Sequence, residues 1–430
     1  MTRARSLVLG IAVLLAAAQT RAQDWPQFRG PGSHNVAEAV DLPSHWGAET
    51  NLAWKARVPG RGWSSPIVAG DRVFVTTAVQ EEAPEEAERR VKGGVYRWEV
   101  HCYDLATGEA LWQRVATRGA PRIATHQGNT YASETPVTDG RRVYAYFGMT
   151  GVFAYDLEGT LAWKKDLGVS SMEADWGTSS SPLLHGGTIY LQIDSEGDSF
   201  LVALDTESGD EIWRVARDEG SNWSSPIIWK NTKRTELVAS GQKVRSYDPT
   251  TGELLWELGI GGGRCSASPA ADHQRLYVGS EEREDGGGLL FAVKAGASGD
   301  ITPREGETTS GGVAWSLEKA GPPMASPLVY RGLVYVLKRR TGIVTTYDAK
   351  TGEEVYKERL EGAPGFWASP WVSDGTVFCL DDTGTTHALR AGPQFEVLAR
   401  NVLDEQTWAS PAVTPRGLVL RGVDHLYCVR

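Results

Sequence analysis

Short runs of alternating apolar and polar residues recur along most of the chain, and each run ends in a turn. After Ser65-Pro66, an apolar run extends to Ala69, a turn follows at Gly70-Asp71, and a second apolar run occupies 73–75. Alternation with a period of two is typical of a half-buried β-strand. Short runs separated by Gly- and Asp-containing turns are typical of antiparallel hairpins. The pattern therefore predicts an all-β chain of short strands.

A unit that contains these strands repeats eight times. The prolines that open successive units are 70, 46, 44, 43, 58, 43 and 41 residues apart. A regular period in the low forties, with two longer copies, is the mark of a repeat fold. Each unit opens with a small residue and a proline, at Ser65-Pro66, Thr135-Pro136, Ser181-Pro182, Ser225-Pro226, Ser268-Pro269, Ser326-Pro327, Ser369-Pro370 and Ser410-Pro411.

Within a unit, the third strand ends in Tyr-Asp or Leu-Asp, a Gly-containing turn follows, and a fourth strand carries an aromatic residue. Residues 247–256 show this order, from Tyr247-Asp248 to Trp256. Asp bonds its own backbone in tight turns and Gly accepts positive φ, while the Trp is large enough to fill the wedge between neighbouring units. We therefore assign these residues to packing rather than to a metal or cofactor, and interpret each unit as a four-stranded propeller blade.

The two ends of the repeat region complement each other. The last unit stops after its third strand, at residues 426–430, and the segment Leu52-Ala53-Trp54-Lys55 has the same sequence as the fourth-strand segment Leu161-Ala162-Trp163-Lys164. Closure by this segment would remove the open sheet edges. We expect residues 51–430 to form an eight-bladed β-propeller of four-stranded antiparallel blades, with the last blade closed by an N-terminal strand.

The first fifty residues predict export. Residues 1–22 combine Arg3 and Arg5, an apolar run from Leu7 to Ala18 and small residues, which is typical of a secretory signal peptide too short to span a membrane. Cleavage is expected near Gln23 or after Ala18, and residues 23–50 form an irregular lead-in with aromatic anchors that lies against the propeller. The predicted cleavage point carries no cysteine, so no lipid anchor is expected there. No transmembrane segment is expected either. The predicted location is periplasmic or secreted.

The net charge limits the classes of partner, and the positions of the cysteines argue against disulfides. The net charge of −10 falls to −13 when the three arginines of the signal segment are removed, which argues against nucleic acid or anionic lipid as a partner. Cys265 and Cys379 occupy unrelated repeat positions. Cys102 and Cys428 occupy the same position in the first and last units, but equivalent strands of adjacent blades should lie too far apart for a bridge. Four buried free thiols are expected.

The residue three positions before each opening proline is expected at the mouth of the axial channel, on the face where the long loops gather. Four of these positions, in consecutive blades, are predicted to form an apolar arc, with serines on most of the other side. Such a funnel could stack a flat ligand or a sugar ring; alternatively, its tryptophans plug the channel or pack under loops. The eight residues are Trp63, Ser133, Ser179, Trp223, Ser266, Met324, Trp367 and Trp408.

Charged residues beside the mouth could orient a ligand, although nothing in their spacing specifies catalysis. They are Arg61, His126, Glu134, Glu173, Asp175, Arg264 and Glu405. The chain has no zinc spacing, nucleophile elbow, phosphate loop or haem-attachment motif. No catalytic or metal-binding residue is therefore predicted. The ligand-binding candidates are Trp63, Trp367, Trp408, Met324, Trp223, Arg264, His126 and Glu134.

The Ser-Pro opening, the Tyr247-to-Trp256 motif and the lead-in Trp25-Pro26-Gln27-Phe28-Arg29-Gly30-Pro31 resemble the exported proteins built of pyrroloquinoline-quinone (PQQ)-like repeats. That superfamily includes quinoprotein alcohol dehydrogenases, which bind PQQ with calcium, and a cofactor-free lipoprotein that assists outer-membrane β-barrel assembly. The resemblance specifies the fold rather than the function. The dehydrogenases carry two adjacent bonded cysteines, which this chain does not have, and their calcium-ligand set is not identifiable here. The cysteine that anchors the lipoprotein is also missing.

The expectation from sequence is a binding or scaffold module that uses its loop-rich face and channel mouth, with no cofactor and no intrinsic catalysis. Its partner would be a protein, a small molecule or a glycan. The alternative is a PQQ-dependent oxidoreductase in which Trp63, Trp367 or Trp408 stacks on the quinone. A weaker alternative is a sugar-binding or sugar-active protein.

Overall fold

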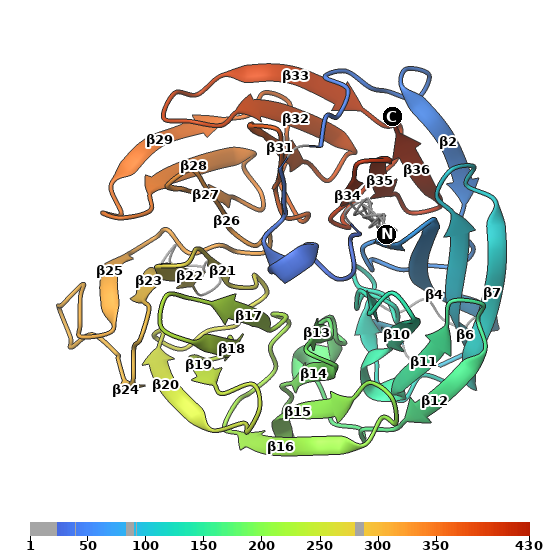
Figure 1. Cartoon of the computed structure of the whole chain (residues 1–430), viewed down its shortest axis with the longest axis horizontal. Helices are drawn as coiled ribbons and strands as arrows, with labels where there is room; N and C mark the ends of the chain where they lie inside the picture. The colour runs from blue at the N-terminus through green and yellow to red at the C-terminus, as the bar shows by residue number, and fades with distance from the viewer. Residues whose placement is uncertain (1–23, 39, 83–89, 92, 280–287) are drawn as a thin grey trace, which may run out of the picture.

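Eight antiparallel sheets surround a central axis in the part of the chain that the computed structural model describes, residues 24–38, 40–82, 90–91, 93–279 and 288–430 (Figure 1). Each blade contains four antiparallel strands from the axis outward, in chain order except in blade 8, whose outermost strand comes from the N-terminal side of the chain. Blades 4 and 7 each carry one additional parallel strand at an edge. The predicted all-β, eight-bladed propeller is confirmed.

The blades follow the predicted repeat. Blade 1 contains β3 (Ile67–Ala69), β4 (Arg72–Glu82), β6 (Val95–Asp104) and β7 (Ala110–Gly119); blade 2 contains β9 (Val137–Thr138), β10 (Arg142–Tyr146), β11 (Val152–Asp156) and β12 (Leu161–Lys165). Blade 3 contains β13 (Leu183–His185), β14 (Thr188–Ile193), β15 (Ser199–Asp205) and β16 (Glu211–Arg217); blade 4 contains β17 (Ile227–Lys230), β18 (Thr235–Ala239), β19 (Lys243–Tyr247) and β20 (Leu254–Gly259). Blade 5 contains β21 (Ala270–Ala271), β22 (Arg275–Gly279), β23 (Leu290–Lys294) and β25 (Val313–Leu317); blade 6 contains β26 (Leu328–Tyr330), β27 (Leu333–Leu337), β28 (Ile343–Asp348) and β29 (Glu354–Arg359). Blade 7 contains β30 (Trp371–Ser373), β31 (Thr376–Leu380), β32 (Thr385–Arg390) and β33 (Val397–Val402); blade 8 contains β34 (Ala412–Thr414), β35 (Gly417–Arg421), β36 (His425–Val429) and β2 (Leu52–Arg57).

The ring closes through β2, as predicted. This strand pairs antiparallel with β36, with Trp54 opposite Cys428. The Trp54 indole also donates a 2.9 Å hydrogen bond from Nε1 to the carbonyl of Leu105 in blade 1. The N-terminal strand thus completes blade 8 and contacts blade 1.

The fourth-strand tryptophans of blades 1, 2, 3, 5 and 8 bond to the next blade, whereas Trp256 of blade 4 bonds to Glu236 within its own blade. Trp112 of blade 1 donates to the carbonyl of Leu157 in blade 2 at 2.8 Å, and Trp163 of blade 2 donates to that of Thr206 in blade 3 at 3.0 Å. The turn glycine of the next blade allows this contact, because a Cβ on Gly108 would lie 2.6 Å from the Trp54 ring. These residues therefore have the packing function that the repeat predicts.

The hydroxyl residue before each proline forms a chain of hydrogen bonds around the axis. The backbone N–H of Ser65 donates to Oγ1 of Thr135 at 2.9 Å, and the N–H of Thr135 donates to Oγ of Ser181 at 3.0 Å. The same contact continues blade by blade to Ser410. A buried hydrogen bond of this kind contributes about 1 kcal/mol. The requirement at this position is therefore a hydroxyl acceptor and not only a small residue.

The lead-in crosses the axis instead of only covering the outside. Trp25 forms a two-way backbone bridge with Val68 of blade 1, and the N–H of Leu184 in blade 3 donates to Oε1 of Gln27. β1 (Val36–Ala37) then pairs parallel with β30 of blade 7. Figure 1 shows this segment, with the short 3₁₀ helix η1 (Pro31–Ser33), at the centre of the ring. The segment contacts the inner strands at or after their prolines, and it therefore closes the end of the channel opposite the predicted mouth.

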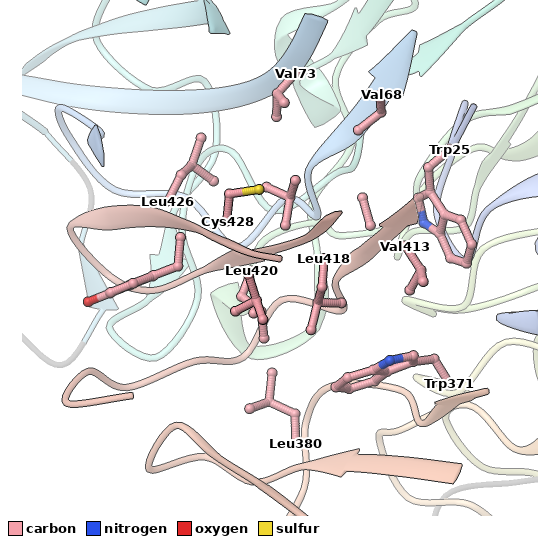
Figure 2. Close-up of a cluster of buried hydrophobic side chains, with 14 of the residues drawn as sticks. Trp25, Val68, Val73, Trp371, Leu380, Val413, Leu418, Leu420, Leu426 and Cys428 are labelled. Carbon is pink, nitrogen blue, oxygen red and sulfur yellow. The ribbon is translucent and has the colours of Figure 1, made fainter. Parts of the chain in front are cut away.

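Buried side chains hold the lead-in segment in place across the channel. Trp25 is fully buried in a cluster with residues of blades 1, 7 and 8, and Figure 2 shows Val413 between Trp25 and Trp371. Arg29 is also buried and donates to the carbonyls of Pro269 and Pro327 at 2.6 and 3.2 Å. Burial lowers the pKa of Arg29 to about 9, because the charged form loses its hydration.

Two outer blade edges are covered by other segments. β24 (Gly299–Asp300), in the blade 5 insertion, pairs parallel with β20 of blade 4. Gly47 of the lead-in forms a parallel bridge with Val402 at the edge of blade 7. Such covers blunt the tendency of open edges to pair with other chains.

Three further predictions concern the cysteines, membrane-spanning segments and the signal segment. All four cysteines are buried and free, as expected. No described helix has the length and apolar character needed to cross a bilayer. The predicted signal segment, residues 1–22, lies outside the described residues.

Candidate functional site

Three tryptophans of the predicted arc stack on one another at the channel mouth. The ring centroids of Trp63 and Trp408 are 4.6 Å apart, and those of Trp408 and Trp367 are 4.3 Å apart with an interplanar angle of 11°. The guanidinium of Arg339 lies 4.4 Å above the Trp367 ring. We call these four residues the mouth stack. Each of its three indoles is partly exposed.

Loops from neighbouring blades hold the mouth stack. Trp63 Nε1 donates to the carbonyl of Gly128 at 3.2 Å, and the Gly128 N–H donates to Nδ1 of His126 at 3.0 Å. β8 (Thr125–His126) pairs with β5 (Arg90–Val91) of the long blade 1 loop. His126 therefore fixes the loop that anchors Trp63.

A second aromatic cluster occupies the side of the mouth that was predicted to be polar. Trp223 lies 5.6 Å from Trp176, and Arg264 lies 4.5 Å above the Trp176 ring. Arg264 also forms a 2.9 Å ion pair with Glu173, and Trp223 Nε1 donates to the carbonyl of Gly177 at 2.7 Å. We call Trp176, Trp223, Arg264 and Glu173 the second cluster. Trp223 was predicted at the mouth, whereas Trp176, which follows the 3₁₀ helix η3 (Glu173–Asp175), lies in a link outside the repeat and was not predicted.

The serines and Met324 occupy the remaining mouth positions. Ser133 is nearly buried and donates from Oγ to Oδ1 of Asn129 at 2.6 Å. Ser179, Ser266 and Met324 are partly exposed. Glu405 bonds the backbone and side chain of His425, and it therefore clamps two loops of blade 8 together.

Below the mouth, the interior differs between the two halves of the ring. The residue before the hydroxyl position is polar in blades 1 to 4 and alanine in blades 5 to 8: Ser64, Glu134, Ser180, Ser224, then Ala267, Ala325, Ala368, Ala409. Arg421 of blade 8 donates to the carbonyls of Ser64 and Thr76 at 2.8 and 2.9 Å. Burial lowers the pKa of Arg421 to about 9.

Glu134 lies beneath the mouth and not on its surface. Its side chain is buried, with 1% of its surface exposed, and Oε1 accepts a 2.5 Å hydrogen bond from Oγ1 of Thr178. Burial raises the pKa of Glu134 to about 7, since a carboxylate loses hydration in an enclosed site. Among the described residues, no ion pair to Glu134 is formed. A ligand at the mouth would not contact it directly.

The paired ring faces of the mouth stack are closed to PQQ. The indole of Trp408 lies between those of Trp63 and Trp367, and Arg339 covers Trp367, so the stack offers no free face between its members for a flat quinone. Within the described ranges, no three His, Cys, Asp or Glu side chains come together as a metal-binding group. No reaction step through this cofactor is derived.

Similar solved structures confirm the class of fold. The outer-membrane assembly protein BamB from Moraxella catarrhalis aligns with a TM-score of 0.58 and 14% identity, over 88% of this chain and 99% of that one. Quinohemoprotein alcohol dehydrogenase from Comamonas testosteroni aligns with a TM-score of 0.59 and 12% identity, over 96% and 81% of the two chains. The corresponding enzyme ADHIIG from Pseudomonas putida HK5 aligns with a TM-score of 0.62 and 10% identity, over 94% and 80%. At 10–14% identity these similarities show the class of fold, a β-propeller.

The family follows from the sequence match. The profile of the family described as outer membrane protein assembly factor BamB matches residues 96–264, 240–365 and 298–393, more than half of the chain. The chain therefore belongs to this family of PQQ-like repeat propellers. It is also 26% identical over 249 residues to the serine/threonine-protein kinase AfsK of Streptomyces coelicolor and 24% identical over 262 residues to that of Streptomyces griseus. These matches cover 56% and 53% of this chain but only 25% and 29% of the kinases.

Proposed function

We propose that this protein is an exported binding module that holds a segment of a partner protein at its channel mouth, without a cofactor and without catalysis of its own. The observation that carries the proposal is the mouth stack, in which three partly exposed indoles and Arg339 are packed together on the loop-rich face. Trp and Arg are the residues most enriched at the energetic centres of protein interfaces. The basic and apolar start of the chain supports export.

The packing of the stack favours a protein segment over a flat ligand or a sugar. A quinone or a sugar ring needs the open face of an aromatic ring, whereas the inner faces of this stack are in contact with each other. A protein segment uses indole edges and the surrounding rim as well as faces. The second cluster, on another side of the same mouth, adds two further indoles that a chain segment crossing the axis would reach.

Selection of binding peptides tests this proposal. A library of displayed random peptides is selected against the purified chain from residue 23, and the enriched peptides are titrated against variants. Trp408→Ala should weaken binding at least tenfold, because it removes the middle of the stack. Trp112→Ala is the matched control, since Trp112 is a partly buried wedge tryptophan at the rim and should leave the affinity within twofold.

Two results would count against the proposal. Enriched peptides that bind W408A as tightly as the unaltered chain would move the binding surface away from the mouth. Saturable binding of PQQ in the presence of calcium, followed by tryptophan fluorescence and thermal midpoint, would instead favour an oxidoreductase.

A further inference from the structure

Glu134 belongs to a closed set of hydrogen bonds beneath the mouth. Its carboxyl group accepts from Thr178, and the carbonyls of Trp176 and Thr178 accept from Nδ2 of Asn129 at 2.9 and 3.2 Å. Asn129 in turn accepts from Ser133, the residue before Glu134. The set therefore ties the loop at 125–133 to the link at 176–178, with the Glu134 carboxyl group as a member.

These same two segments anchor an indole of each aromatic cluster. Gly128, in the loop, accepts from Trp63 of the mouth stack, and Gly177, in the link, accepts from Trp223 of the second cluster. Gly177 has φ near 76°, and a Cβ there would lie 2.4 Å from Oγ1 of Thr125. The loop and the link are thus packed too closely for one to move without the other.

Backbone packing leaves Glu134 little freedom to find new partners. Gly148 of η2 (Gly148–Thr150) has φ near 48°, and a Cβ there would lie 2.1 Å from Oγ1 of Thr178 and 3.0 Å from Oε1 of Glu134. An ionised carboxylate in this space needs more hydrogen-bond donors than a neutral one. Burial opposes the charge more than Thr178 and the backbone of Ser133 and Glu134 favour it, so ionisation favours a movement of the loop that brings in further donors.

The groups that face Glu134 are mostly neutral. Tyr146 of β10 is fully buried beside it, and burial together with the Glu134 charge raises the Tyr146 pKa. Thr76 of β4 donates to the Glu134 carbonyl and connects it to Arg421 of β35. The loop carries His126 and Tyr131, and the link side carries Glu173 and Asp175. Since the Glu134 pKa lies near 7, the charge of its carboxyl group changes near neutral pH.

We propose that Glu134 is a proton-linked positioning residue, which couples the protonation of the site to the placement of Trp63 and Trp223 at the mouth. Neutral Glu134 accepts from Thr178 with one oxygen and keeps both indoles in the arrangement described above. Ionised Glu134 draws on further donors and loosens the loop and the link together. If the mouth binds a partner segment as proposed, this residue makes that binding dependent on pH.

Fluorine NMR of protein labelled with 5-fluorotryptophan tests the coupling without any partner. The resonances of Trp63 and Trp223 are assigned with W63F and W223F and followed from pH 5 to 9. Both should shift with a midpoint near pH 7 in the unaltered chain and stay constant in Glu134→Gln. Trp229 is the internal control, because its Nε1 also donates to a backbone carbonyl, that of Asp272 at 2.7 Å, in a turn far along the chain.

A second variant separates coupling from general disturbance. Thr178→Val keeps the carboxyl group but removes its hydroxyl donor, which disfavours the ionised form, and the midpoint should rise. The inference would be overturned if the midpoint were unchanged in T178V. It would also be overturned if both indoles shifted with pH in E134Q as they do in the unaltered chain, or if only one of the two indoles shifted in the unaltered chain. Peptides that fail to bind at any pH would contradict the proposed function alone, since the NMR readout needs no ligand.

Discussion

Glu134 distinguishes blade 2 from the other blades, which carry serine or alanine at the same position. Burial raises its pKa from 4.5 to about 7, so the folded chain holds this proton where the unfolded chain has released it. The free energy of unfolding therefore falls as pH rises from about 4.5 to about 7, by about 3 kcal/mol in total. Glu134→Gln cannot release the proton, and it should remove this loss.

Urea denaturation at pH 5 and pH 8 measures the effect. The stability difference between the two pH values should be about 3 kcal/mol smaller in E134Q than in the unaltered chain. Glu396→Gln is the control, because Glu396 is exposed and paired with Arg390, which lowers its pKa. It is ionised at both pH values in both states. Equal pH dependence in E134Q and the unaltered chain would show that Glu134 titrates normally.

At the level of single residues, the sequence predicted which side chains reach the mouth but not how they meet. Trp63, Trp367 and Trp408 occupy equivalent repeat positions, and the repeat placed them in consecutive blades. Their mutual stacking depends on side-chain rotamers, which repeat position does not determine. Trp176 lies in a link without repeat character and was not predicted as part of the site. The sequence shows Glu134 where the other blades have Ser or Ala, but it does not show that the Glu134 side chain is buried.

Among the elements, β2 has the largest consequence for the fold because it joins the two ends of the chain. Trp54 is 8% exposed and contacts both its own blade and blade 1. Trp54→Ala should lower the free energy of unfolding by about 3–5 kcal/mol, the usual cost of deleting a large buried aromatic side chain.

Equilibrium unfolding in urea checks this value, and Leu161→Ala provides the comparison. Leu161 occupies the position in β12 that Leu52 occupies in β2, and it is 47% exposed, so its replacement should change stability by no more than about 0.5 kcal/mol. A loss below about 1 kcal/mol in W54A would mean that ring closure contributes little to stability.

The sequence predicted only part of the structure of the lead-in. Its aromatic residues predicted an anchored segment, and the anchoring is present. Its path across the channel was not predicted, because its partners are backbone carbonyls such as Pro269 and Pro327, and these carry no sequence signal. Only the assembled ring brings acceptors that are more than two hundred residues away in sequence to Arg29.

For the whole molecule, the fold followed from the repeat because every blade restates the same strand lengths, turns and wedge residue. The two ends of the channel are set by elements outside that repeat. The lead-in closes one end, and loops of blades 1 and 6 and the links before blades 2, 3 and 5 complete the two aromatic clusters at the other. In our proposal, the aromatic end of the ring is the binding face, because the lead-in closes the other end. Loops on such a scaffold are where function is usually found.

Hydrogen exchange of the chain with and without a selected peptide tests this account most directly. Binding at the mouth should slow exchange in residues 57–63, 125–133, 176–179, 365–367 and 405–408, which carry or anchor both clusters, and leave the outer strands β7, β12 and β16 unchanged. Protection confined to those outer strands, or to the lead-in at residues 25–37, would contradict the assignment of the mouth as the binding face.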